Sequence, residues 1–178
     1  MNRRQFLTQS LCAAIGALPI GNAVAQSFWD HPRSLWLKRP ATGEERRLVY
    51  WAQGQYLVDG YRDACHMLRD VQANQTVAMD PVLLDILRGM QGWFEAAGIS
   101  RPIILNSGYR SPQTNKKTEG AARNSQHLSG KAADIVIPDV PTDYLAKLAL
   151  YLQGGGVGFY PSKGFVHVDS GNLRVWKG

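Results

Sequence analysis

Apolar residues recur along the chain at the spacing of helices in three regions. In Tyr56–Ala73 they recur every three or four residues, the pattern of a helix with one buried face. A second helix is expected to begin after Asp80, a good N-cap, with Pro81 at its first position and Gly98 at its end. A third helix is expected over Thr142–Gln153.

Shorter apolar runs bounded by turn residues predict strands. The expected strands are Ser34–Lys38, Arg46–Trp51, Pro102–Asn106, Ala132–Pro138, Val157–Tyr160, Phe165–Asp169 and Leu173–Trp176. Tight turns join the first two strands and also the last three, which indicates antiparallel neighbours. The predicted class is therefore α+β, with a small antiparallel sheet and helices packed on one side of it.

The start of the chain has the pattern of an export signal. Arg3 and Arg4 precede a mildly apolar stretch, and Ala23-Val24-Ala25 offers a small-x-small cleavage site. A membrane anchor is the alternative, but roughly 14 weakly apolar residues are too few to span a bilayer. We therefore expect a twin-arginine signal peptide at residues 1–25, a single domain at residues 26–178, no membrane span after cleavage, and a periplasmic protein.

Charge and cysteine content narrow the class of partner. The chain has a formal net charge of +6, and loss of the two signal-peptide arginines leaves +4. No dense stripe of Lys and Arg with interleaved aromatic residues is present, so no nucleic-acid partner is expected, whereas a modest basic excess suits an anionic cell wall. Cys65 is the only cysteine after the signal, so no internal disulfide can form there. The sequence does not indicate an oligomeric state.

The polar segment Ser107–Ser129 and the strand after it carry candidate chemistry. Asp134 lies in an apolar strand, where an unpaired carboxylate is unfavourable unless a cation or strong donors meet it. His127 precedes a turn at Gly130, so its imidazole can return to the same point. Pairing of Asp134 with a loop histidine or with Arg123 is the purely structural alternative.

The strand Phe165–Asp169 supplies a second histidine. Alternation places its two valines in the core and leaves His167 and Asp169 side by side on the opposite face. A lone histidine on a strand is usually a surface or hydrogen-bonded residue. Together with His127 and Asp134, however, it completes a set of three zinc ligands with a fourth position left for water, as in a metallopeptidase.

Four motifs resemble those of the YcbK-like (MepK) murein endopeptidases. The motifs are Ser107-Gly108-Tyr109-Arg110-Ser111, Ser125-x-His127-x-x-Gly130-x-Ala132-x-Asp134, Gly155-Gly156-Val157-Gly158-x-Tyr160 and Phe165-Val166-His167-Val168-Asp169. This family is grouped with the D-Ala-D-Ala metallopeptidases, VanX and hedgehog in one zinc-peptidase fold. The resemblance runs from about residue 34 to residue 176, nearly the whole predicted domain.

The resemblance implies roles for matching positions. It implies one zinc ion per chain, bound by the three ligands named above. It implies that Arg110 stabilises the tetrahedral intermediate or binds the substrate, and that Ser125 helps to orient the peptide. Many relatives carry an acid three residues before the last histidine, but Gly164 stands there in this chain. The YcbK-like branch instead has an acid two residues after it. In this chain that acid is Asp169. Its expected role is either that of the general base or that of a hydrogen-bond partner of His167.

The function implied by the resemblance is zinc-dependent hydrolysis of peptide cross-links in bacterial peptidoglycan. A D,D- or L,D-carboxypeptidase acting on stem peptides is one alternative, because sequence does not reveal how open the groove is. A zinc-stabilised, non-catalytic peptidoglycan-binding module is another, because Gly164 replaces the usual acid. Arg110 and Ser125 favour the enzyme, because a purely structural metal needs neither.

Overall fold

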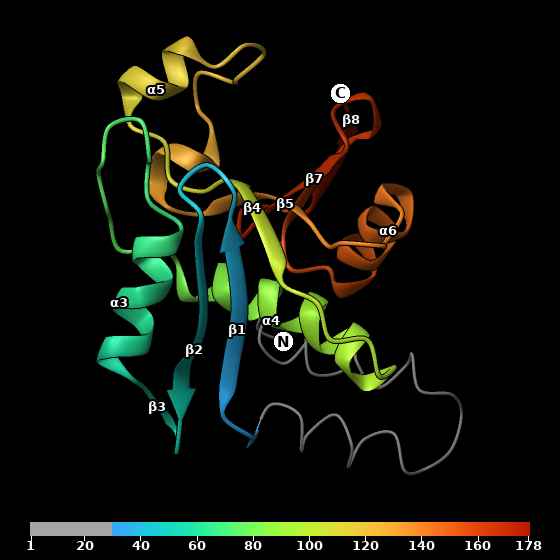
Figure 1. Cartoon of the computed structure of the whole chain (residues 1–178). Coiled ribbons are helices and arrows are strands. Elements are labelled where there is room, and N and C mark those ends of the chain that lie inside the picture. Colours follow the sequence, from blue (N-terminus) through green and yellow to red (C-terminus); the bar gives the residue numbers. More distant parts are fainter. Residues whose placement is uncertain (1–29) are drawn as a thin grey trace.

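A computed structural model of the chain describes residues 30–178 (Figure 1). The signal peptide predicted for residues 1–25 lies outside the described residues. Within residues 30–178, no helix has both the length and the apolar character that a membrane span requires.

Among the described residues, eight strands form one sheet in the order β3-β2-β1-β4-β5-β7-β6-β8. The strands are β1 (Arg33–Arg39), β2 (Glu44–Ala52), β3 (Gln55–Tyr56), β4 (Ile103–Ser107), β5 (Ala132–Val136), β6 (Gly156–Tyr160), β7 (Phe165–Asp169) and β8 (Arg174–Lys177). The β1–β4 and β6–β8 pairs are parallel and the other pairs are antiparallel.

The sheet is thus larger than predicted, and it is mixed rather than antiparallel. Each parallel pair joins strands that are not consecutive in the chain. Between β1 and β4 the chain passes through β2, β3 and two helices, and between β6 and β8 it reverses direction twice through β7. Local turns predict only the pairing of consecutive strands, so the sequence did not reveal these two contacts.

The helices of the described chain are α3 (Val58–Met67), α4 (Pro81–Ala96), α5 (Pro112–Lys117) and α6 (Thr142–Leu152), with short 3₁₀ turns η1 (Gln126–Ser129) and η2 (Pro161–Lys163). Helix α4 begins as predicted, because the Asp80 carboxylate accepts a hydrogen bond from the N–H of Val82 at 2.9 Å and Pro81 takes the first position.

Helix α3 is shorter than the helix predicted over residues 56–73. After its last turn the Asp70 carboxylate accepts hydrogen bonds from the N–H groups of Gln72 at 3.0 Å and Ala73 at 3.1 Å. A side chain that satisfies these backbone donors competes with continuation of the helix. The other oxygen of Asp70 accepts from the N–H of Ser111 at 2.8 Å, so the resulting turn holds the start of α5.

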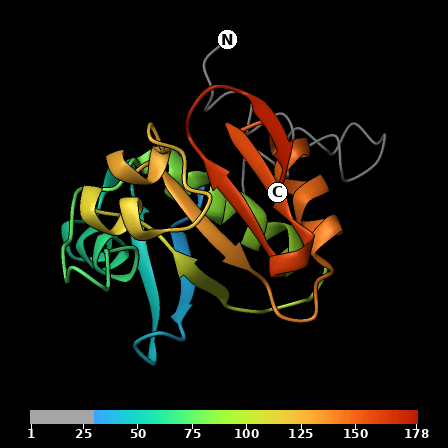
Figure 2. The same cartoon turned by 90° about the horizontal axis from the view of Figure 1, so that it is seen from above.

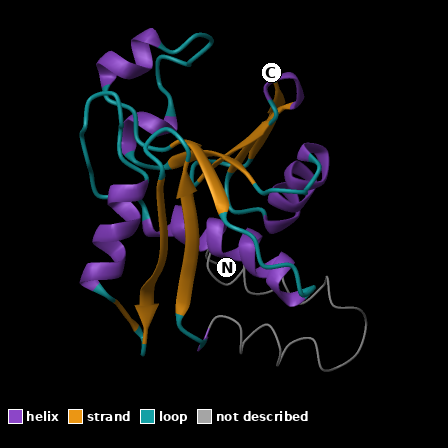
Figure 3. Ribbon diagram, in the orientation of Figure 1, coloured by secondary structure: helices purple, strands orange, loops and turns teal. Residues whose placement is uncertain are grey.

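Helices α3, α4 and α6 pack on one face of the sheet, as expected (Figures 1 and 3). On β1, the fully buried Leu35 and Leu37 face these helices, and Val166 and Val168 do so on β7. Alternation therefore turns the residues between the valines to the opposite face. On that side α5 contacts η1, which in turn contacts β5 (Figure 2).

Candidate metal centre and substrate pocket

The first part of the site is a cross-strand pair. Strands β5 and β7 are antiparallel, with Asp134 directly opposite His167 and Ala132 opposite Asp169. Oδ1 of Asp134 lies 2.9 Å from Nδ1 of His167, and both side chains are buried. The register of two neighbouring strands thus places a carboxylate and an imidazole in contact.

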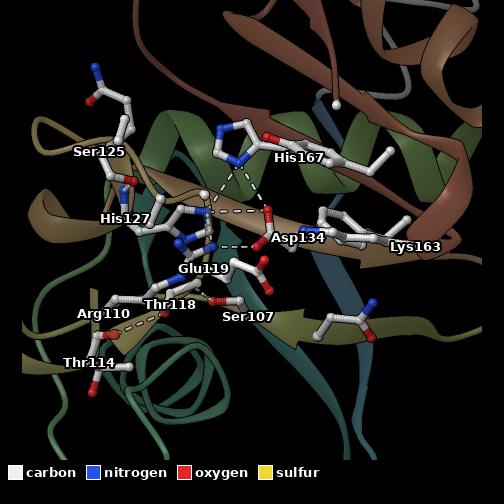
Figure 4. A pocket seen from close by; sticks show the side chains of 18 of the residues that line it. Ser107, Arg110, Thr114, Thr118, Glu119, Ser125, His127, Asp134, Lys163 and His167 are labelled. Atoms are coloured by element: carbon white, nitrogen blue, oxygen red, sulfur yellow. Dashed lines mark hydrogen bonds and ion pairs between the residues drawn. The ribbon is translucent and has the colours of Figure 1, made fainter. Parts of the chain in front are cut away.

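The third member of the cluster comes from η1. The Ser125 hydroxyl accepts a hydrogen bond from the N–H of His127 at 3.3 Å, and Gly130 ends the turn with a left-handed φ of 66°. This turn directs Nε2 of His127 to 3.2 Å from Oδ1 of Asp134 and 3.1 Å from Nδ1 of His167. The side chains of His127, Asp134 and His167 converge on one point (Figure 4).

The neighbours of each histidine determine which ring nitrogen carries the proton. Nδ1 of His127 contacts the carbonyl oxygen of Gly108, which only accepts, so this nitrogen is the donor and Nε2 keeps a lone pair. Nε2 of His167 donates to Oδ2 of Asp169 at 2.9 Å, so Nδ1 keeps its lone pair. Both lone pairs face the Asp134 carboxylate. Three acceptor atoms in contact require a cation or a proton between them, and this donor set fits zinc.

The electrostatics of the cluster agree with this reading. Burial acts to raise the pKa of Asp134, but its contacts with the two imidazoles outweigh it and hold the pKa well below its usual range, so the carboxylate is ionised. Burial lowers the pKa of His127. Burial acts in the same direction on His167, but its contacts with Asp134 and Asp169 prevail and raise its pKa. A proton therefore competes with a metal ion for Nδ1 of His167.

Arg110 lies directly beside the cluster. Its Nε donates to the Ser107 hydroxyl at 2.9 Å, and its Nη2 donates to Oδ2 of Asp134 and contacts Nε2 of His127 at 3.0 Å. The Arg110 N–H donates to the carbonyl of His127 at 3.1 Å, which fixes the backbone as well. A largely buried guanidinium is thus held next to the candidate ligands.

Asp169 lies on the far side of the His167 ring. It is 1% exposed and accepts hydrogen bonds from His167, from the Arg174 guanidinium, and from the N–H groups of Gly156 and Gly171. Burial acts to raise the pKa of Asp169, but the hydrogen bonds from His167 and Arg174 lower it to about 2. Asp169 contacts the ring nitrogen that points away from Asp134.

The cluster opens into a pocket of about 1130 Å³. One wall is formed by the loop between α5 and η1, and the other by residues at the ends of β6, β7 and β8. Side chains that line it and were not singled out in the sequence include Glu119, Lys163, Arg174 and Trp176. Figure 4 shows Glu119 and Lys163 beside the cluster. For Arg174 and Trp176 the available sequence signal was their spacing of two residues, which places both side chains on one face of a strand.

The structure brings together most of the residues singled out in the sequence. Ser125 also lines the pocket, although its hydroxyl oxygen caps η1. Within residues 30–178, Arg123 forms no hydrogen bond or ion pair with Asp134. The alternative in which Arg123 neutralises the Asp134 carboxylate therefore finds no support. Asp134 is instead paired with Arg110 and the two histidines.

Comparison with known proteins identifies the family. The family model for peptidoglycan L,D-endopeptidase MepK matches residues 28–176. The chain is 34% identical over 185 residues to the peptidoglycan L,D-endopeptidase MepK of Escherichia coli (strain K12), with 98% of this chain and 97% of that protein covered. It is 33% identical over 188 residues to a probable MepK of Haemophilus influenzae, with 99% and 96% covered. The chain therefore belongs to the peptidoglycan L,D-endopeptidase MepK family and is a peptidase.

Proposed function

We propose that this peptidase hydrolyses peptide cross-links of bacterial peptidoglycan with one zinc ion per chain, held by His127, Asp134 and His167. The observation that carries the proposal is the convergence of two imidazole lone pairs on a buried carboxylate. The relatives are named as L,D-endopeptidases, and we propose the same bond class, an L,D amide, for this chain.

Zinc at this position would polarise the carbonyl of the scissile amide and lower the pKa of a water molecule. Oδ1 of Asp134 faces the two histidines, whereas Oδ2 faces Arg110. Because different oxygens serve these partners, Arg110 can keep its contact with Asp134 when a cation is bound at Oδ1. The contact of Arg110 with Nε2 of His127 occupies the lone pair that would bind a metal ion, so His127 would hold the metal only after giving up this contact.

Arg110 is proposed to stabilise the negative charge that develops on the carbonyl oxygen of the substrate. A fixed guanidinium next to the reacting carbonyl acts without reorganisation, which is the basis of oxyanion stabilisation. The hydrogen bond from Arg110 Nε to Ser107 and the backbone bond to His127 supply this rigidity. Ser125 is proposed to help orient the peptide, because its hydroxyl proton is free to donate while its oxygen caps η1.

For Asp169, the geometry supports the role of a partner that orients His167. Its carboxylate is fully buried, and Oδ2 is shared between His167 and Arg174. A general base must reach the water that it deprotonates, and this carboxylate is separated from the cluster by the imidazole ring. A hydrogen bond to the second ring nitrogen is the usual way to fix the tautomer of a metal-binding histidine.

The lining of the pocket favours an endopeptidase over a carboxypeptidase. Its walls come from both sides of the cluster, so a peptide can be held on either side of the scissile bond. We also propose a periplasmic location reached through the twin-arginine route, supported by the Arg3-Arg4 pattern and by the location of peptidoglycan outside the inner membrane.

The test is a digest of defined muropeptides by zinc-loaded residues 26–178. We expect cleavage of dimers joined by an L,D amide bond, detected by mass spectrometry as the two monomers. Dimers joined by a D,D bond serve as the comparison. Release of a single terminal amino acid from monomers would indicate the carboxypeptidase instead. Intact substrates of every kind, with zinc bound to the protein, would contradict the proposed function.

A further inference from the structure

Arg174, near the end of the chain, makes a two-pronged contact with Asp169. Its Nη2 donates to Oδ2 at 2.6 Å and its Nη1 to Oδ1 at 3.2 Å. The Asp169 side chain is completely buried, whereas 41% of the Arg174 side chain is exposed. Such bidentate pairs between a guanidinium and a carboxylate are strong and geometrically specific. Arg174 therefore controls the orientation of the carboxylate from its solvent side.

Oδ2 of Asp169, which accepts from Nη2 of Arg174, also accepts a hydrogen bond from His167. Oδ2 lies 2.9 Å from Nε2 of that ring, and Oδ1 accepts from the N–H groups of Gly171 at 2.7 Å and Gly156 at 3.2 Å. The carboxylate is thus held at both oxygens and cannot turn freely. Because Oδ2 sets the direction of the Nε2–H bond, the position of Asp169 determines where Nδ1 of His167 points.

Strand β6 is shaped to admit the side chains of β8. In the β6–β8 pair Gly156 is opposite Arg174, and Gly158 is opposite Trp176. A Cβ on Gly156 would lie 2.6 Å from both Nη1 of Arg174 and Oδ2 of Asp169, and one on Gly158 would lie 2.7 Å from the Trp176 ring. Both side chains therefore cross β6 at positions that have no side chain of their own, and reach β7 beyond it.

Trp176 completes this arrangement. Its ring centroid is 5.1 Å from that of His167, and its Nε1 donates to the Tyr160 hydroxyl at 2.9 Å. The Arg174 guanidinium lies 5.0 Å from the same indole. Strand β8 thus covers the outer side of His167 with the Trp176 indole. It also covers Asp169, the hydrogen-bond partner of His167, with the Arg174 guanidinium.

We propose that Arg174 is a positioning residue of the metal centre, acting on His167 through Asp169. This inference rests on the proposed zinc site and adds the last strand to it. Without the guanidinium, Asp169 loses the two hydrogen bonds that hold it from the solvent side, and the His167 ring is held less firmly in the tautomer that leaves Nδ1 free. Loss of an outer hydrogen-bond partner typically lowers metal affinity about 10-fold to 100-fold.

The first experiment measures zinc affinity in residues 26–178 by competition with a chelating dye. We expect Arg174→Gln to weaken zinc binding about 10-fold to 100-fold, and the absorption spectrum of the cobalt-substituted protein to change with it. Arg174→Lys should recover part of the affinity, because one ammonium replaces one prong of the contact. Lys177→Gln, a cation on the same strand outside the pocket, is the matched control and should bind like the wild type.

A double-mutant cycle separates action through Asp169 from general destabilisation. Asp169→Asn combined with Arg174→Gln should bind zinc as weakly as Asp169→Asn alone, because the two residues lie in one chain of contacts. Additive losses would overturn the inference. Arg174→Met keeps most of the side-chain volume without the charge, so it should reproduce the loss if Arg174→Gln folds poorly.

The outcomes distinguish this inference from the proposal beneath it. Equal zinc affinity in the wild type and His167→Ala would contradict the metal centre itself. Tight zinc binding by the wild type together with an unchanged affinity and cobalt spectrum in Arg174→Gln would overturn the positioning role alone.

Discussion

Nε2 of His167 lies 2.9 Å from Oδ2 of Asp169, on the side of the ring opposite to the nitrogen that faces Asp134. This relationship makes Asp169 a hydrogen-bond partner of His167, a proposed metal ligand. We therefore expect Asp169→Asn to lower zinc affinity about 10-fold to 100-fold, with much of the rate restored by added zinc. Rate and zinc content should be measured together over a zinc titration.

If Asp169 were instead the general base, the same variant would keep its zinc and lose roughly 100-fold or more in rate. Wild-type rate and wild-type metal content would contradict both roles. Glu119→Gln is the useful comparison, because Glu119 is a carboxylate that lines the pocket. A rate loss there with full metal content would locate the proton acceptor on the loop between α5 and η1.

The metal ligands give a second prediction. Purified protein should contain about one zinc ion per chain, and His127→Ala or His167→Ala should abolish it, because two ligands hold zinc poorly. Removal of the metal with a chelator should stop hydrolysis, and added zinc should restore it. His66→Ala is the control, since that histidine is exposed, pairs with Glu44 and does not line the pocket. Full zinc content in either ligand variant would refute the assignment.

Arg110 gives a third prediction. Arg110→Ala should lower kcat about 100-fold to 1,000-fold, the usual cost of losing one group that stabilises the oxyanion. The rate should be measured with zinc in excess and zinc content determined beside it, because Arg110 also donates to Oδ2 of Asp134, a proposed ligand. Arg101→Ala removes an exposed arginine paired with Asp139 and should leave kcat unchanged. An unaltered kcat in Arg110→Ala would exclude a role in the transition state.

Export gives a fourth prediction. Replacement of Arg3 and Arg4 by lysine should leave the protein in the cytoplasm at precursor length, because the translocase reads the paired guanidinium groups. Cell fractionation and an immunoblot measure both location and length. A shortened periplasmic form at normal abundance would be incompatible with the twin-arginine route.

Local pattern was sufficient for the parts of the site that lie within one strand or turn. Alternation placed His167 and Asp169 on the face turned away from the core, and the Gly130 turn explained how His127 returns to Asp134. The N-cap and proline signals placed the start of α4 correctly. These features depend on backbone periodicity and on short-range hydrogen bonds, which sequence encodes directly.

Features set by distant segments were not predicted. The parallel β6–β8 pair depends on where the chain returns after β7, and so does the contact between Arg174 and Asp169. Read alone, Arg174 is one more cation in a polar C-terminal stretch. The early end of α3 depends on the Asp70 carboxylate, which joins its own turn to Ser111, far along the chain.

The cross-strand pairing of Asp134 with His167 would also tie retention of the proposed metal to correct folding. A slip of β7 by one residue along β5 would turn His167 into the apolar core and bring a valine to the carboxylate. Misfolded molecules of this kind would keep the same composition and much of the same strand content, yet would hold no metal. If the proposed zinc site holds, zinc content per chain would separate correctly registered molecules from slipped ones that circular dichroism would not distinguish.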